Sequence, residues 1–195
     1  MKIEIIKKHQ QKESVWSGGK TNQIYIHPSD STLQDRDFDF RISSAIVEVE
    51  ESEFSPFNGY DRALMVLNGE LEILHENQYS KKLEQYEVDN FSGDWKTTSK
   101  GKITDFNLIF KRGLKGELNY LNIFGNKIIT KEISVLPNRV GYFVISGELK
   151  IGIDNSEYKI QIGELLMIEK VNNFSEKLMY FDGKCEVVEL LIFNV

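Results

Sequence analysis

Short apolar segments rich in Ile, Val, Phe and Tyr recur along the chain at nearly regular intervals. Clusters of Asn, Gly, Asp and Ser separate them, and helical periodicity is scarce. This pattern is typical of the strands of an all-β sandwich or barrel. The clearest predicted strands lie within residues 23–28, 38–50, 62–76, 102–112, 142–154, 164–171 and 184–195.

Two of these segments share one local pattern. The stretches LMVLNGELEI (64–73) and YFVISGELKI (142–151) align on Gly69 and Gly147, which are 78 residues apart. In both, a further strand follows at a similar distance. The matched spacing favours a duplicated β-unit over a chance likeness of two strand-turn-strand segments.

The repeated unit resembles a cupin, a small jelly-roll barrel. VLNGELEI and VISGELKI are similar to the first cupin motif, and IQIGELLMIEK (160–170) is similar to the strand pair that leads into the second. Two copies predict an all-β bicupin, with two cupin-type barrels packed together. We expect an N-terminal barrel with the N-terminal strands in residues 1–113 and a degenerate C-terminal barrel in residues 114–195.

A narrower resemblance covers the first half of the chain. Four stretches are similar, in order, to the HutD/Ves family: WSGGKTNQIYIHP, FRISSAIVE, SEFSPFNGYDRALMVLNGE and FSGDWKTTSKGKITDFNLIFKRG. This family consists of bicupins and includes a protein of bacterial histidine-utilisation operons. The resemblance implies the bicupin fold and a link to histidine or other amino-acid catabolism, but it brings no assigned reaction.

Charge and composition limit the partners and the cellular compartment that we expect for the protein. The net charge of −6 argues against a nucleic-acid partner, because such proteins usually carry a basic face. Cys185 is the one cysteine, which points to a reducing compartment. No apolar run approaches the roughly 18 residues of a membrane span. We therefore expect a cytoplasmic protein without a membrane partner, and keep a homodimer as a candidate assembly.

The stretch SVWSGGKT (14–21) resembles the end of a phosphate-binding loop. Gly19, Lys20 and Thr21 fit that motif, but Ser14 occupies the place of its first glycine. A β-rich segment follows where such a loop would open a helix. We therefore expect Gly18 and Gly19 to permit a tight turn before a strand, with Lys20 solvated.

The positions that hold a metal in many cupins carry no suitable ligand here. Such cupins have a glutamate seven residues before the motif glycine, where this chain has Arg62 and, in the second repeat, Val140. We interpret His9, His27 and His75 as surface or loop residues. The sequence therefore predicts no metal site and no cofactor.

Arg62 gives the predicted site a positive charge at the position where metal-binding cupins have a glutamate. Alternation along the strand places Arg62, Leu64 and Val66 on one face, and the cupin resemblance directs that face into the barrel. An inward guanidinium suits a carboxylate ligand, held by a bidentate contact. The alternative is a structural ion pair with an internal carboxylate such as Asp105.

Further polar and aromatic residues are candidates for the same pocket. If Arg41, Ser43, Asp105 and Asn107 point inward they form a polar pocket, whereas outward they form an ordinary solvated face. Trp16 and Trp95 are candidate pocket walls, with core plugs as the alternative. The acidic stretch 48–54 is interpreted as a solvated strand end.

The sequence thus favours a metal-free bicupin that binds a small anionic carboxylate metabolite as a sensor or regulatory protein. The alternative is a metal-independent cupin enzyme that acts on a small carboxylate, although no catalytic residue is assigned. A structural or protein-interaction role is favoured if the pocket proves to be packed shut.

Overall fold

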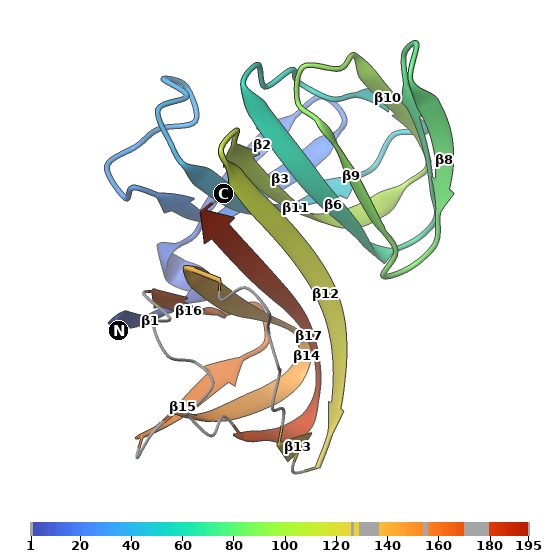
Figure 1. Cartoon of the computed structure of the whole chain (residues 1–195). Coiled ribbons are helices and arrows are strands. Elements are labelled where there is room, and N and C mark those ends of the chain that lie inside the picture. The colour runs from blue at the N-terminus through green and yellow to red at the C-terminus, as the bar shows by residue number, and fades with distance from the viewer. Residues whose placement is uncertain (1, 126, 129–136, 154–155, 170–179, 195) are drawn as a thin grey trace. The chain divides into compact units, whose positions relative to one another are not determined.

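The protein is built from β-strands, as the sequence predicts. The computed structural model describes residues 2–125, 127–128, 137–153, 156–169 and 180–194. Within these ranges the only helical segment is a 3-10 turn at Lys8–Gln10 (Figure 1). No helix among them is long and apolar enough to cross a lipid bilayer.

The chain divides into two compact units. Residues 11–116 form the N-terminal unit, and residues 1–10 with 117–195 form the C-terminal unit. The division falls close to the expected boundary after residue 113. The first strand differs from the expectation, because β1 (Lys2–Ile6) pairs with β16 (Leu165–Glu169) of the C-terminal unit.

The N-terminal unit contains two antiparallel sheets. The six-stranded sheet has the order β2-β3-β4-β11-β6-β9, with β2 Lys12–Trp16, β3 Gly19–His27, β4 Phe40–Val47, β11 Ile103–Lys111, β6 Tyr60–Asn68 and β9 Val88–Ser92. The four-stranded sheet has the order β5-β10-β7-β8, with β5 Glu51–Glu53, β10 Thr97–Lys100, β7 Leu71–His75 and β8 Tyr79–Leu83.

One hydrophobic cluster joins these two sheets and defines the barrel interior. It combines Leu64 and Val66 of β6 with Leu71 and Ile73 of β7, all at most 1% exposed. Because side chains alternate along a strand, Arg62 lies on the same inner face as Leu64 and Val66. The predicted inward direction of Arg62 therefore agrees with the structure.

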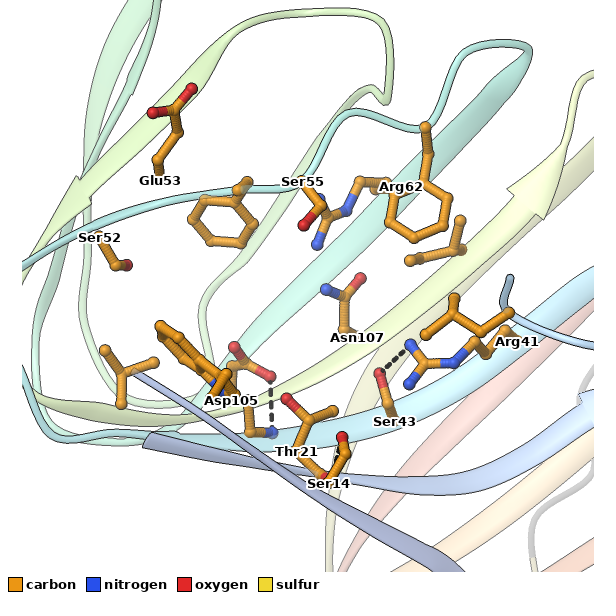
Figure 2. A pocket seen from close by; sticks show the side chains of 17 residues that line it. Ser14, Thr21, Arg41, Ser43, Ser52, Glu53, Ser55, Arg62, Asp105 and Asn107 are labelled. Atoms are coloured by element: carbon orange, nitrogen blue, oxygen red, sulfur yellow. Dashed lines mark hydrogen bonds between the residues drawn. The ribbon is translucent and has the colours of Figure 1, made fainter. Parts of the chain in front are cut away.

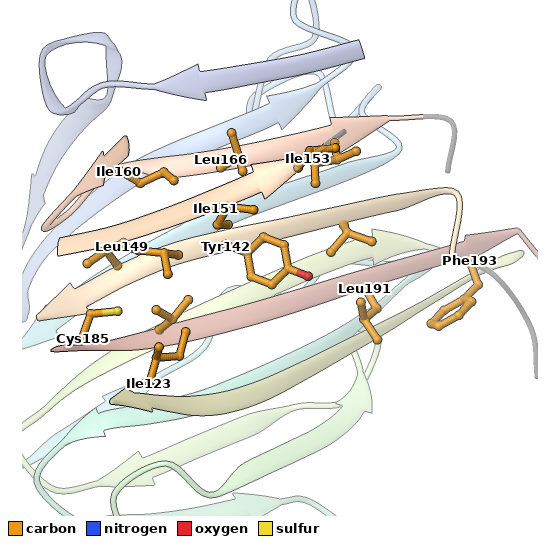
Figure 3. Packing of buried hydrophobic residues seen from close by; sticks show 14 residues of the cluster. Ile123, Tyr142, Leu149, Ile151, Ile153, Ile160, Leu166, Cys185, Leu191 and Phe193 are labelled. Atoms are coloured by element: carbon orange, nitrogen blue, oxygen red, sulfur yellow. The ribbon is translucent and has the colours of Figure 1, made fainter. Parts of the chain in front are cut away.

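The C-terminal unit is built on a seven-stranded sheet. The order is β1-β16-β14-β17-β12, while β15 pairs with β14 and β13 with β17. The strands not yet named are β12 Leu114–Phe124, β13 Lys127–Ile128, β14 Arg139–Ile153, β15 Ser156–Gln161 and β17 Tyr180–Asn194. Their buried side chains form an apolar core that includes Tyr142, Leu149, Ile151 and Cys185 (Figure 3).

The predicted duplication is visible in the order and spacing of the strands. A shift by the 78 residues between Gly69 and Gly147 places β6 and β7 on β14, β8 on β15 and β9 on β16. Both glycines have positive φ, +90° and +76°. Gly69 follows the end of β6, whereas Gly147 lies inside the continuous β14, close to a register shift against β17.

The stretch 14–21 forms a hairpin and not a phosphate-binding loop. β2 ends at Trp16 and β3 begins at Gly19, so Ser17 and Gly18 form a two-residue turn. A Cβ on Gly18 would lie 2.1 Å from the Trp16 ring, so the absence of a side chain lets the indole pack there. Lys20 lies 3.3 Å from Glu13 on the surface.

Gly147→Ala should destabilise the protein by roughly 3 kcal/mol, because backbone strain and a steric clash act together. A Cβ at this position would lie 2.1 Å from the Lys184 carbonyl oxygen. Gly125→Ala is the matched control, since its φ of +73° is similar but, apart from its chain neighbours, no atom of the described residues lies within 4 Å of the added Cβ. It should lose only about 1 kcal/mol. Urea unfolding measures both, and equal losses would contradict the proposed clash.

Candidate functional site: a cavity between two buried arginines

The N-terminal unit contains a cavity of about 280 Å³ on the inner side of its six-stranded sheet (Figure 2). The volume suits a small metabolite, since pockets for larger, drug-sized ligands span about 300–1,000 Å³. Strands β2, β3, β4, β5, β6 and β11, the connection between β3 and β4 and the segment 54–57 supply its lining: Ser14, Trp16, Thr21, Leu33, Arg41, Ser43, Ala45, Val47, Ser52, Glu53, Phe54, Ser55, Phe57, Arg62, Asp105, Asn107 and Ile109.

The strand register arranges the polar lining in rows across the sheet. Ile109 of β11 pairs with Arg41 on one side and with Arg62 on the other, so the two arginines flank it in one row. In the next row along β11, Asn107 lies beside Ser43. Asp105 occupies the row after that. The sheet therefore presents an arginine end and a carboxylate end to the same cavity.

Arg62 is buried among aromatic rings. Its side chain is 5% exposed, and its guanidinium carbon lies 4.8 Å from the centroid of Phe54, 5.1 Å from Phe91 and 5.8 Å from Phe57. Ring faces attract a cation at this range. Its Nε has no hydrogen-bond partner among the described residues. Burial lowers the pKa of Arg62 to about 10, which leaves the group charged at neutral pH.

Arg41 is equally buried but is held by neighbouring side chains. Its Nε donates to Gln23 at 2.8 Å and its Nη1 donates to Ser43 at 2.9 Å. Burial lowers the pKa of Arg41 to about 10, against the opposing attraction of Asp105. These bonds fix the orientation of the second guanidinium at the cavity wall.

Asp105 supplies a buried carboxylate at the other end of the cavity. Its Oδ1 accepts a hydrogen bond from the backbone N–H of Ala45 at 3.1 Å. Burial nevertheless raises the pKa of Asp105 to about 6, although this bond and the two arginines favour the ionised form. No salt bridge joins Asp105 to Arg62 within the described chain, so the structural ion pair considered from the sequence is not formed.

Asn107 lies between the two arginines. It is 6% exposed, and its Oδ1 has no hydrogen-bond partner among the residues described. Figure 2 shows the amide between the guanidinium of Arg62 and the pair formed by Arg41 and Ser43. The cavity therefore contains a buried acceptor that the surrounding side chains do not satisfy.

The structure brings six of the seven predicted site residues to this cavity. Arg41, Ser43, Arg62, Asp105, Asn107 and Trp16 all contribute to the lining. Trp95 does not. It packs against the barrel core, where its ring centroid lies 5.5 Å from His75 and 6.0 Å from Tyr79.

The interpretation of His75 as a surface or loop residue is wrong. Its side chain is 0% exposed and lies 2.8 Å from Thr97 Oγ1 and 2.9 Å from Asp89 Oδ2. A local signal was present, because burial alternates along β7 and His75 shares its buried face with Leu71 and Ile73.

The aromatic wall around Arg62 is absent from the sequence-based site. Phe54 and Phe57 come from the segment after β5, and Ser52 lies in β5 itself. These residues belong to or follow the acidic stretch that was interpreted as a solvated strand end. Glu53 is exposed, in agreement with that interpretation, but Phe54 packs against the barrel core.

The lining does not fit the divalent metal that many cupins hold. Arg62 stands where the ligand glutamate would be, and the two buried guanidinium groups repel a cation more strongly than the one buried carboxylate attracts it. The parts of the chain that the structure describes contain no group of three or more His, Cys, Asp and Glu side chains that is able to hold a metal ion.

The fold defines the protein as a bicupin, and comparison with known proteins agrees. The chain belongs to the HutD family, whose model matches residues 8–187. Comparison with curated proteins found no match.

Solved structures of low sequence identity share this fold. The chain is similar to a conserved protein of unknown function, PA5104, from Pseudomonas aeruginosa PAO1 (21% identity, TM-score 0.83, covering 99% of this chain and 100% of that one). It is also similar to HutD from Pseudomonas fluorescens SBW25 (22%, TM-score 0.71, 98% and 99%). A third is YhhW from Escherichia coli, a bacterial pirin in complex with nickel(II) (11%, TM-score 0.69, 100% of both chains).

Asp105→Asn should change how stability depends on pH. The folded pKa of Asp105 is about 6, whereas an unfolded aspartate titrates near 3.9. Between these values the folded wild type binds more protons than the unfolded chain, so its stability falls as pH rises from about 4 to about 6. The variant lacks this titration. Relative to the wild type, it should gain ~2 kcal/mol between pH 4.5 and 7.5. Parallel urea-unfolding profiles would contradict this.

Proposed function

We propose that this HutD-family bicupin binds a small carboxylate metabolite in its N-terminal barrel, without a metal, and acts as a sensor or regulatory protein. The proposal rests on one observation, the burial of a charged Arg62 in the cavity lining. This side chain is buried and charged, it lines a cavity, and its Nε has no partner within the described chain. A buried donor of this kind is costly unless a ligand or water satisfies it.

The charge balance of the cavity supports an anionic ligand. Arg41 and Arg62 are protonated at neutral pH, and only one buried carboxylate, that of Asp105, opposes them in the lining. A guanidinium matches a carboxylate well, because its planar N–H groups form charge-assisted and often paired hydrogen bonds. A carboxylate at Arg62 would thus neutralise the excess positive charge.

The family supplies the metabolic setting of the proposal. HutD proteins resemble this chain across most of its length, and the name is that of a protein of histidine-utilisation operons. We therefore place the ligand among the small carboxylates of histidine or other amino-acid catabolism. The first compounds to test are urocanate, formylglutamate and glutamate.

A metal-independent enzyme is the second candidate function, and Asp105 is the observation that favours it. A carboxyl with a pKa of about 6 beside a cavity is suited to proton transfer near neutral pH. If the protein is an enzyme, Asp105→Asn should abolish turnover while binding persists. If NMR shows that the wild type leaves every bound carboxylate chemically unchanged, this candidate fails.

Arg62→Ala should abolish binding of these carboxylates with little effect on the free energy of unfolding. Arg62→Lys keeps the charge but loses the planar fork, so affinity should fall by about tenfold or more. A thermal-shift screen detects binding, because a ligand of the folded state raises the melting temperature. Titration calorimetry then gives the affinities.

The matched control is Arg112→Ala, which removes a half-exposed arginine that pairs with Asp94 in the same unit and should leave binding unchanged. A purely structural Arg62 predicts a different outcome: Arg62→Ala would lose roughly 3–5 kcal/mol of stability. That loss, together with a wild type that no carboxylate stabilises, would overturn the proposed function.

A further inference from the structure

Two buried polar atoms of opposite hydrogen-bonding character lack partners, and both belong to residues that line the cavity. Within the described chain, the buried side-chain nitrogen and oxygen atoms without a partner are Arg62 Nε, a donor, and Asn107 Oδ1, an acceptor. Unsatisfied buried atoms are uncommon in folded proteins, and a pair in one cavity points to a ligand that completes both.

The register brings these two groups within reach of one small molecule. Asn107 pairs with Leu64, and its neighbour in the next row, Ile109, pairs with Arg62. Asn107 and Arg62 are therefore diagonal neighbours on the same inner face, about 7–8 Å apart at the backbone, a separation that long side chains span. Figure 2 shows both groups directed into the cavity.

The neighbouring side chains do not satisfy the Asn107 oxygen. Arg41 is also a diagonal neighbour, but its Nε and Nη1 donate to Gln23 and Ser43. The Ser43 hydroxyl accepts one of these bonds. The ligand must therefore bring a hydrogen-bond donor for Asn107 in addition to an acceptor for Arg62.

A simple carboxylate meets only half of this requirement. Its oxygens accept from the Arg62 guanidinium, but when ionised it has no hydrogen to donate. Its binding would leave Asn107 Oδ1 desolvated and unpaired. An N–H group placed near the carboxylate supplies the missing donor.

We propose that the cavity selects carboxylates that carry an N–H donor adjacent to the carboxylate, with Arg62 binding the carboxylate and Asn107 Oδ1 accepting from the N–H. This inference rests on the proposed function and adds the class of carboxylate. Asn107 acts as the specificity determinant, because its Oδ1 favours a ligand with an N–H donor over a ligand of equal charge and similar shape that lacks this donor.

Pyrrole-2-carboxylate and furan-2-carboxylate test this directly. They have nearly the same shape and charge, but the ring N–H of the first is an ether oxygen in the second. The wild type should bind the pyrrole at least about tenfold more tightly, because the furan leaves a buried acceptor unpaired. Titration calorimetry at pH 7.5, where Asp105 is mainly ionised, measures both.

Variants separate the roles of the two residues. Asn107→Leu, a near-isosteric apolar change, should reduce the pyrrole-to-furan ratio to about one, while Arg62→Ala should abolish binding of both rings. Asn107→Asp retains an acceptor and should still prefer the pyrrole, although its added negative charge weakens binding of both. The comparison on the wild type requires no variant, so a misfolded Asn107 variant does not prevent the test.

The remaining outcomes distinguish this inference from the proposed function. Equal binding of the two rings, preference for the furan, or binding of acceptor-only carboxylates such as furan-2-carboxylate and acetate alone would overturn the selection for an N–H donor. The proposed function would still stand in those cases. Failure of every carboxylate to bind the wild type would overturn both.

Discussion

The site depends on the cost of keeping the Arg62 guanidinium charged inside a barrel. Removal of a cation from water is expensive, and the usual compensation is a carboxylate in direct contact. Here the faces of Phe54, Phe57 and Phe91 surround the group, and Asp105 acts only from a distance. The aromatic faces stabilise the charge without using its hydrogen-bond donors. The protein thus retains a buried cation whose Nε has no hydrogen-bond partner among the described residues, as the proposed binding of a carboxylate requires.

The duplicated unit has an apolar residue in its second copy at the position equivalent to Arg62. Val140 stands seven residues before Gly147, as Arg62 stands before Gly69, and Val140 is 1% exposed within an apolar core. An apolar side chain there contributes burial energy and needs no partner. One copy of the repeat therefore carries a buried charge at this position, and the other carries a buried apolar side chain. That asymmetry is consistent with a binding role confined to the N-terminal unit.

The fold and part of the site were predictable from the sequence, because they depend on the local pattern of residues along each strand. The period of two along the strand is visible in the sequence and placed Arg62 on one face with Leu64 and Val66, and the cupin resemblance directed that face into the barrel. The position of Phe54 was not predictable, because the segment after β5 has no periodic pattern and its packing depends on tertiary contacts. Trp95 and His75 illustrate the same limit. Trp95 was a candidate pocket wall with a core plug as the alternative, and it is partly buried against the barrel core, whereas His75 was interpreted as a surface or loop residue and is fully buried.

The sign of the charge at one position gives a physical reason why the site in this barrel suits an anion, whereas the site of a metal-binding cupin suits a cation. A glutamate pointing into the barrel attracts a cation, whereas Arg62 at that position repels it. Arg41 adds a second positive charge and Asp105 removes one, so the buried groups of the lining carry one net positive charge at neutral pH, while the other carboxylate of the lining, Glu53, is exposed to solvent. Charge alone does not discriminate among small carboxylates. Discrimination requires directional groups near the charge, and Asn107 is a buried lining residue whose Oδ1 has no hydrogen-bond partner within the described chain.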